Sequence, residues 1–242
     1  MKDLFSKHSL RYKQARPNYS IQIVKEILKH VPERTFAWDC GAGSGQFTQL
    51  LAPYFDHVVA TDISEAQLQQ APYFENVSYQ VQAAEQSNLP AQSVDLVTVA
   101  QAIHWFDFDA FYKEVKRVLK PQGVFAAIGY GLIEVQDTAV NSLVQQLYFE
   151  TLNGYWDAER RYIDELYQSI PFPFNEQAVP EMHLQYQWSS QQLLSYLKTW
   201  SALTHYQEKN HHDPLQLISN ALHAVPENLD VTFPVLLRVG MV

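Results

Sequence analysis

Short apolar runs alternate with helix-spaced apolar residues along the first half of the chain. The runs predict five strands, at 35–39, 57–63, 76–82, 93–102 and 123–131. The spacing between them predicts helices at 45–55, 64–71 and 107–120. The strands are almost continuously apolar, as they are when helices cover both faces of a parallel sheet. This alternation predicts an α/β fold with a doubly wound, mostly parallel sheet.

The alternation stops after residue 131. Residues 132–180 have helical spacing, with candidate helices at 141–152 and 159–170, and the PFPF stretch that follows would end them. Further on, the pattern predicts a strand at 181–188, helices at 189–206 and 213–225, and a closing strand at 228–242. The predicted N-caps of these two helices are Ser189 or Ser190, and Asp213 with Pro214 after it.

Composition narrows the class of protein. The net charge of −9 argues against a general nucleic-acid surface, which needs clustered Lys and Arg. Cys40 is the only cysteine, which excludes an intrachain disulfide and a thiolate metal cluster. The adjacent His211 and His212 have no third ligand spaced nearby, so we expect a surface loop there and no metal site. No apolar run approaches a membrane span and no signal peptide is evident, so we expect a cytoplasmic protein without membrane contact.

A glycine-rich stretch directly follows the first predicted strand. Glycines at 41, 43 and 45 leave the backbone bare where a ligand binds in such folds. A dinucleotide fingerprint would need its third glycine where Gln46 stands. Asp39, at the strand tip, would repel a pyrophosphate but suits a ligand with ammonium and sulfonium charges. S-adenosylmethionine carries both and has no phosphate, so the stretch favours this cofactor.

Other candidate site residues follow the later strands. Asp62 ends the second strand, where a carboxylate can accept both ribose hydroxyls, although it could also cap the helix that follows. Glu85 could accept from the adenine amino group or lie in solvent. Gln101 ends the fourth strand, and His104 and Trp105 after it could line a ligand crevice or form the apolar entry to the next helix.

The chain resembles the class I S-adenosylmethionine-dependent methyltransferases. The resemblance is carried by WDCGAGSGQFTQLLA, TDIS, AAEQSNLPAQSVDLVTVAQAIHWFD and FYKEVKRVLKPQGVFAAIGYG, and it covers residues 8–131 most strongly. The stretches RYKQARPNY and AQAIHWFD are similar to those of the trans-aconitate methyltransferase-like subgroup. The resemblance implies a Rossmann-like sheet of seven mostly parallel strands, the last antiparallel, with a helical cap inserted after strand five.

The resemblance also implies roles for individual residues. The methionine part would bind at the loop, the ribose at Asp62, and the adenine beside Ala84 and Glu85, while Gln101 and Ala102 would lie near the sulfonium. An N-terminal lid would turn Tyr12, Arg16 and Tyr19 inward. The full set of expected cofactor-binding residues is Asp39, Gly41, Ala42, Gly43, Gly45, Asp62, Ile63, Ala84, Glu85, Gln101, Ala102, Tyr12 and Arg16. Relatives often carry Asp where this chain has Ala83, so adenine recognition would depend on Glu85 or on the backbone.

We expect four units in the chain. These are a lid and helix at 1–33, a cofactor-binding core at 34–131, a helical substrate cap at 132–180, and a segment at 181–242 that completes the sheet. The expected substrate residues are His104, Trp105, Arg160 and Arg161. His104 is the nearest candidate for a general base, although a structural role is an alternative. Either arginine could bind an anionic substrate, or both could be solvated at a helix start.

The predicted function is methyl transfer to a small molecule such as a carboxylate. The alternatives are methylation of RNA or protein, and a regulatory relative that binds the cofactor without turnover. A macromolecular substrate would call for a basic or peptide-binding surface that the composition does not indicate. We expect no nucleic-acid partner, and a monomer or a homodimer.

Overall fold

A parallel sheet forms one half of the molecule. The computed structural model describes residues 15–222 and 228–242. Five parallel strands lie in the order β3-β2-β1-β4-β5. Their bounds are β1 (Phe36–Cys40), β2 (His57–Asp62), β3 (Val77–Val81), β4 (Val94–Ala100) and β5 (Leu119–Tyr130). The strand order reverses between β1 and β4, which is where such folds bind ligands.

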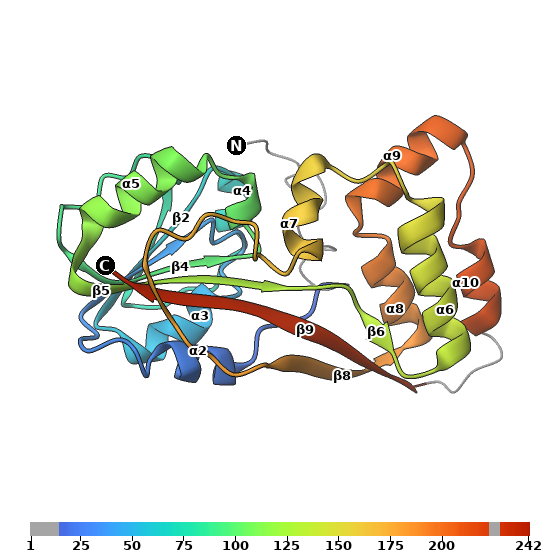
Figure 1. The fold of residues 1–242 in the computed structure, drawn as a ribbon, viewed down its shortest axis with the longest axis horizontal. Coiled ribbons are helices and arrows are strands. Elements are labelled where there is room, and N and C mark those ends of the chain that lie inside the picture. The colour runs from blue at the N-terminus through green and yellow to red at the C-terminus, as the bar shows by residue number, and fades with distance from the viewer. Residues whose placement is uncertain (1–14, 223–227) are drawn as a thin grey trace.

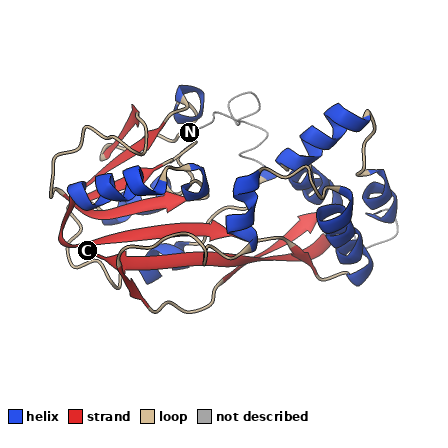
Figure 2. Cartoon of the chain, turned by 45° about the horizontal axis from the view of Figure 1, so that its top comes forward, coloured by secondary structure: helices blue, strands red, loops and turns tan. Residues whose placement is uncertain are grey.

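Helices cover both faces of this sheet. α2 (Ile21–Ile27), the one-turn α3 (Thr48–Leu51) and the 3₁₀ helix η2 (Ala52–Tyr54) lie on one face, and α5 (Phe108–Val118) lies on the other (Figures 1 and 2). α4 (Glu65–Leu68) contacts β2 and β3. The burial of these helices follows their apolar spacing, as when α5 buries Phe111, Val115 and Val118.

One long strand joins the two halves of the molecule. β9 (Asn228–Met241) runs antiparallel to β5 and continues past its end (Figure 1). Three further strands pair with β9, all antiparallel to it: β6 (Glu134–Val135), β7 (Asn175–Gln177) and β8 (His183–Ser189). The carboxyl half of β9 therefore belongs to the core sheet, and its amino half belongs to a small sheet beside the helices.

The second half of the molecule is helical. α6, α8 and α10 lie together beyond the end of the core sheet, and α7 lies between this group and the core (Figure 1). The helices are α6 (Thr138–Gln146), the π-helical turn η4 (Leu147–Thr151), η5 (Ala158–Arg160), α7 (Arg161–Asp164), α8 (Ser190–Leu197), α9 (Ser201–Asn210) and α10 (Gln216–Ala221). Helices from both sides of β8 in the chain thus share this region.

The predicted architecture is confirmed, and several details were wrong. All seven expected strands are present, but β6 and β7 fall in 132–180, where we expected only helices. The predicted helix at 45–55 starts only at Thr48, because the positive φ angles of the glycine turn delay it. The predicted helix at 189–206 is two helices, because Trp200 takes an extended conformation (φ −73°, ψ 124°) and is fully buried.

Some of the predicted helix ends are confirmed and others differ from the structure. Ser189 caps α8 as predicted and forms a capping box with Gln192, and Ser20, Ser64 and Asp107 cap α2, α4 and α5. α10 starts at Gln216, later than predicted, because the Asp213 carboxylate accepts from the Leu215 amide in a separate turn. The strand predicted at 123–131 begins earlier, because β5 starts at Leu119, beside a shift in its register with β4, and the helix predicted to reach 120 ends at Val118.

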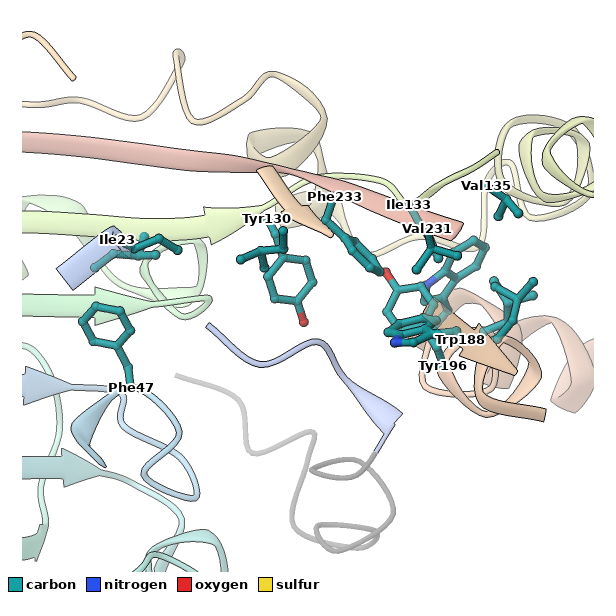
Figure 3. Packing of buried hydrophobic residues seen from close by; sticks show 14 of the residues in the cluster. Ile23, Phe47, Tyr130, Ile133, Val135, Trp188, Tyr196, Val231 and Phe233 are labelled. Carbon is teal, nitrogen blue, oxygen red and sulfur yellow. The ribbon is translucent and has the colours of Figure 1, made fainter. Parts of the chain in front are cut away.

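A continuous apolar cluster links the core to the helical half. It runs from Ile23 and Phe47 through Tyr130 and Phe233 to Trp188 and neighbouring side chains (Figure 3). The Phe233 ring centroid lies 5.6 Å from that of Tyr130 and 5.4 Å from that of Trp188. The two halves therefore share one core on this face of the sheet.

Candidate functional site

The loop after β1 requires glycine at three positions. Gly41, Gly43 and Gly45 have φ angles of +69°, +55° and +74°. A side chain at Gly41 would also place its Cβ 2.7 Å from that of Ala102. Because φ is positive at all three, another residue would be strained there. The loop backbone, including Ala42, is therefore free of large side chains at the carboxyl edge of the sheet.

Asp39 lies beneath this loop and is fully buried. Its two carboxylate oxygens accept hydrogen bonds from the hydroxyls of Thr48 (2.6 Å) and Thr98 (2.8 Å). Burial raises the pKa of Asp39 to about 6, and the two hydroxyl hydrogen bonds only partly offset it. Because the Asp39 carboxylate is buried, it can influence a ligand on the loop through its charge and not by direct contact with solvent.

Asp62 ties the loop to the end of β2. Its carboxylate accepts from the backbone amides of Gly43 (2.9 Å) and Ser64 (2.8 Å). Asp62 and Ile63 are both half-buried. The structure thus brings together the glycine loop and the carboxylate that the sequence separates by about twenty residues.

The loop after β3 adds a third acidic group. Ala84 is buried, and the Glu85 carboxylate accepts from the Asp107 amide (3.3 Å) at the start of α5. The charges of Asp39, Asp62 and Glu85 all act on the Cys40 thiol, whose pKa is raised mainly by its burial and further by these carboxylates. The edge where the loop lies is therefore acidic.

The tip of β4 holds a strained residue. Gln101 has a φ of +53°, which is uncommon for a residue other than glycine and tends to occur at functional sites. Its side-chain amide donates to the Tyr130 carbonyl (3.2 Å), and its amide oxygen accepts from the Tyr167 hydroxyl (3.3 Å). Ala102 follows, packed against Gly41.

His104 and Trp105 lie in the short 3₁₀ helix η3 (Ile103–Trp105) that comes next. His104 is buried, its Nδ1 lies 3.4 Å from the Tyr167 hydroxyl, and its ring packs on Trp105. Burial, together with the positive charges of Arg160 and Arg16, lowers the pKa of His104 to about 3. His104 is therefore neutral at physiological pH.

A cavity lies between the tip of β4 and the helical half. Residues from the core, the N-terminal segment, the region around α7 and the start of α9 line it together. They are Arg16, Gln101, His104, Trp105, Trp156, Asp157, Arg160, Ile163, Thr199, Trp200 and Ser201. The lining combines indole rings with two guanidinium groups and one carboxylate.

Arg160 is held rigidly at this cavity. Its guanidinium lies 5.1 Å from the ring centroids of both Tyr148 and Trp156. Its Nε donates to the Tyr148 hydroxyl (2.6 Å) and lies 3.4 Å from the half-exposed Asp164 carboxylate. Its two terminal nitrogens have no hydrogen-bond partner within residues 15–222 and 228–242. The group is thus oriented by its stem and aromatic neighbours, with its terminal donors available.

The remaining predicted residues differ in whether they line the cavity. Arg161 is exposed, stacks on the Tyr162 ring and does not line the cavity. Arg16 lines the cavity and donates to the Tyr130 hydroxyl (3.4 Å) and the Thr199 carbonyl (3.2 Å). Tyr12 lies outside the described residues. The ring of Tyr19 packs edge-on against Phe47.

Sequence reasoning missed several residues of this site. Trp156 and Trp200 wall the cavity, and Tyr167 reaches Gln101 and His104 from the turn after α7. The aromatic content of 132–180 was a signal, but it did not distinguish packing residues from cavity residues. Within the described ranges, no three His, Cys, Asp or Glu side chains group as metal ligands, and no helix is long and apolar enough to cross a membrane.

Comparisons with known proteins agree with this geometry. A family model described as a methyltransferase domain matches residues 38–127. A Dictyostelium discoideum protein named a methyltransferase is 36% identical over 243 residues, covering 96% of this chain and 92% of that protein. A protein of Saccharomyces cerevisiae named an S-adenosylmethionine-dependent methyltransferase is 32% identical over 127 residues, covering 49% of this chain and 44% of that protein.

A solved structure extends the agreement to the whole fold. The structure of a protein from Anaeromyxobacter dehalogenans, named a type II methyltransferase, is 41% identical and superposes with a TM-score of 0.86. It covers 93% of this chain and 97% of that one. Both halves of the molecule, and not only the parallel sheet, are therefore similar to those of this relative.

Proposed function

The chain belongs to the class I S-adenosylmethionine-dependent methyltransferases, and we propose that its acceptor is a small organic acid whose carboxylate is bound by Arg160. S-adenosylmethionine is the cofactor, and it supplies a methyl group already activated on a sulfonium. The protein therefore has to position the acceptor and exclude water.

The residues at the acidic edge fit this cofactor. The left-handed glycines leave backbone space that a bound nucleoside can approach, and Asp62 offers a carboxylate to ribose hydroxyls. Three carboxylates around the loop favour a ligand with positive charges and disfavour a pyrophosphate. Asp39, buried beneath the loop, would contribute through its charge. We propose that Ile63, Ala84, Glu85 and Ala102 complete the cofactor site.

Arg160 is the single observation that supports an organic acid as the acceptor. A guanidinium stacked between two rings and anchored through Nε still has two terminal nitrogens, which match the two oxygens of a carboxylate. Arg16 and Arg160 add two positive charges to the lining and Asp157 one negative charge, while the Asp164 carboxylate, outside the lining, lies 3.4 Å from the Arg160 Nε. Arg161, one residue away, stacks on a single ring, that of Tyr162, and does not line the cavity.

The walls of the cavity favour a small acceptor over a polymer. Trp105, Trp156 and Trp200 enclose it from three separate segments of the chain, and the chain has a net charge of −9. A nucleic-acid substrate would need a basic surface along its path. Flat apolar walls with a fixed guanidinium instead suit a planar organic acid.

The test compares two neighbouring arginines. Arg160→Gln should raise the KM for organic acids by about 10- to 100-fold, the scale of a lost hydrogen bond to a charged group of about 1.5–3 kcal/mol. Arg161→Gln, the matched control, should leave it within about twofold. The measurement is transfer of labelled methyl to a panel of carboxylic acids and their uncharged amides.

Two results would count against the proposal. Equal turnover of acids and amides would show that the negative charge is not recognised. Equal Michaelis constants for the Arg160 and Arg161 variants would show that Arg160 does not bind it. Calorimetric binding of S-adenosylmethionine without turnover of any acid would favour the regulatory alternative.

A further inference from the structure

A chain of hydrogen bonds ends at His104. The Gln101 side-chain amide donates its N–H to the Tyr130 carbonyl (3.2 Å), which fixes the amide orientation and turns its oxygen toward Tyr167. The Tyr167 hydroxyl lies 3.3 Å from that oxygen and 3.4 Å from Nδ1 of His104. Along this series of hydrogen bonds, the donor or acceptor role of each group fixes the role of the next group.

Counting protons along this chain assigns the histidine tautomer. A Gln side-chain oxygen can only accept, so the Tyr167 hydroxyl must donate its single proton to Gln101. The Tyr167 oxygen can then only accept from His104, so the proton of the neutral ring lies on Nδ1. Nε2 of His104 therefore carries a lone pair.

That lone pair is open to the cavity. Nε2 of His104 has no hydrogen-bond partner in the part of the chain that the structure describes. This nitrogen is not fully buried, and His104 lines the cavity. A hydrogen-bond acceptor thus stands at the tip of β4, in the same cavity as Arg160.

Burial and the surrounding charges keep this nitrogen unprotonated. Burial is the larger cause that disfavours an imidazolium at His104, and the positive charges of Arg160 in η5 and Arg16 in the N-terminal segment act in the same direction. Tyr167 stays protonated, because burial raises its pKa. Asp157, the carboxylate in the lining, accepts from the Ser201 hydroxyl (2.9 Å). The lone pair is therefore present throughout the physiological pH range.

Several contacts hold Tyr167 in the position from which its hydroxyl reaches Nδ1 of His104. It is fully buried, and it follows Leu166 with both residues in the left-handed region (φ +54° and +62°). Its ring occupies the space over Gly129 where a side chain would stand, and Arg238 donates to its carbonyl (3.0 Å). Backbone strain held in place by such contacts tends to mark functional positions.

We propose that the acceptor is a planar hydroxy acid, that Nε2 of His104 accepts the hydrogen of its hydroxyl, and that this hydroxyl oxygen is the atom methylated. The inference rests on the proposed function and adds which group reacts. A carboxylate oxygen beside Nε2 would place two hydrogen-bond acceptors against each other, whereas a hydroxyl group can donate its hydrogen to Nε2. The carboxylate held by Arg160 is then the anchor. Tyr167 and Gln101 are positioning residues.

The transfer step balances with this assignment. The hydroxyl oxygen uses a lone pair to form the new bond to the methyl carbon, and the carbon–sulfur bond breaks with its electron pair left on sulfur. The hydroxyl proton passes to Nε2 of His104 and then to solvent. An ether and a neutral thioether result. The acceptor's carboxylate partly neutralises Arg160, which favours the transient imidazolium.

The experiment identifies the methylated atom. The probes are 2-, 3- and 4-hydroxybenzoate, benzoate and phenol, each incubated with labelled S-adenosylmethionine and the full chain. We expect a methoxybenzoate from at least one hydroxybenzoate, competitive inhibition without product from benzoate, and little reaction of phenol, which lacks the anchor. Mass spectrometry distinguishes the ether from the methyl ester.

Variants test the residues that present the lone pair. His104→Phe keeps a ring of similar size and should lower kcat by about 100-fold or more, the scale of lost acid–base catalysis. Tyr167→Phe should lower kcat by about 3- to 10-fold, with the KM for the acid and the affinity for S-adenosylmethionine within twofold. Tyr162→Phe, which removes a hydroxyl bonded to the exposed Arg161, is the matched control and should change nothing.

The possible failures are distinguishable. Methyl esters as the products would overturn the inference and leave the proposed function intact. Wild-type kcat in both His104→Phe and Tyr167→Phe would overturn it as well. Turnover of other organic acids but no hydroxybenzoate would overturn the assigned substrate class, and no turnover of any acid would overturn the proposed function itself.

Discussion

Asp39 shows how one buried carboxylate can favour binding at the expense of stability. It is fully buried, and its pKa is raised to about 6 because burial disfavours the charged form. The folded state therefore holds this proton more tightly than the unfolded state does. The stability that this linkage contributes is greatest below about pH 4 and falls as the pH rises through 6. Ionised Asp39 would favour a cationic ligand on the loop above.

Asp39→Asn tests whether the Asp39 carboxylate lowers the stability of the fold while favouring the binding of a cationic ligand. Asn keeps the shape and can pair with the hydroxyls of Thr48 and Thr98, so we expect the variant to gain about 1–3 kcal/mol of unfolding free energy relative to wild type between pH 4.5 and pH 8. Its affinity for S-adenosylmethionine at pH 8 should fall. Urea unfolding at several pH values and calorimetry measure both. The exposed Asp56→Asn is the control, and a stability difference independent of pH would contradict the argument.

At the scale of elements, α5 holds the loop that follows β3. The Glu114 carboxylate accepts from the Ser87 amide (2.8 Å) and hydroxyl (2.6 Å) and pairs with Arg117 (2.7 Å). Arg117 in turn donates to the Leu89 carbonyl (2.8 Å). Burial alone would raise the pKa of Glu114, but these hydrogen bonds outweigh it and lower the pKa to about 2.

Glu114→Gln should therefore loosen this loop. Loss of the charged hydrogen bonds should cost about 1–3 kcal/mol of unfolding free energy at pH 7. Because the folded pKa is lowered, the advantage of wild type should be complete above about pH 4.5 and disappear as the pH falls toward 2. Hydrogen exchange should speed up at the amides of 87–89. Asp109→Asn, exposed on the same helix, is the control, and unchanged exchange would refute the anchoring role.

Local sequence signals predicted most of the elements and the neighbouring positions of several candidate site residues. Strand tips and a run of glycines can be read from short stretches, which is why Gly43 and Asp62 were expected together and are found hydrogen-bonded. The backbone of Gln101 and the break at Trp200 could not be read this way. Their conformations depend on buried contacts with distant residues, and Tyr167 lies 66 positions beyond Gln101.

The cavity between the tip of β4 and the helical half depends even more on long-range packing. Arg160 and Arg161 are equivalent in the sequence, but Arg160 packs against Tyr148 and Trp156 at the cavity, whereas Arg161 is exposed and contacts Tyr162. Arg16 was expected at the cofactor, and the structure places it in the lining of the cavity, because Tyr130 of β5 and Thr199, between α8 and α9, supply its partners. Its predicted role as a cofactor contact stays a prediction.

At the scale of the whole molecule, β9 makes the helical half part of the core. Its carboxyl end pairs with β5 and its amino end with β8, so a single strand passes through both halves (Figure 1). The apolar cluster follows it, with Phe233 against the rings of Tyr130, Trp188 and Tyr196 (Figure 3). The cavity takes walls from both halves, so its geometry depends on this junction.

Phe233→Ala should therefore destabilise both halves at once. The side chain is fully buried, and its loss should cost about 3–5 kcal/mol through transfer and cavity terms. Because the cluster is continuous, we expect one cooperative transition at lower denaturant, with far-UV dichroism of the sheet and tryptophan fluorescence coinciding. Four of the five tryptophans, at 105, 156, 188 and 200, lie at or beyond the cavity, so fluorescence reports mainly on that region. Phe233→Leu should show the same single transition with a smaller shift. Helical residues unfolding before the sheet would mean that the junction does not couple the two halves, and the cavity could then open independently of the glycine loop.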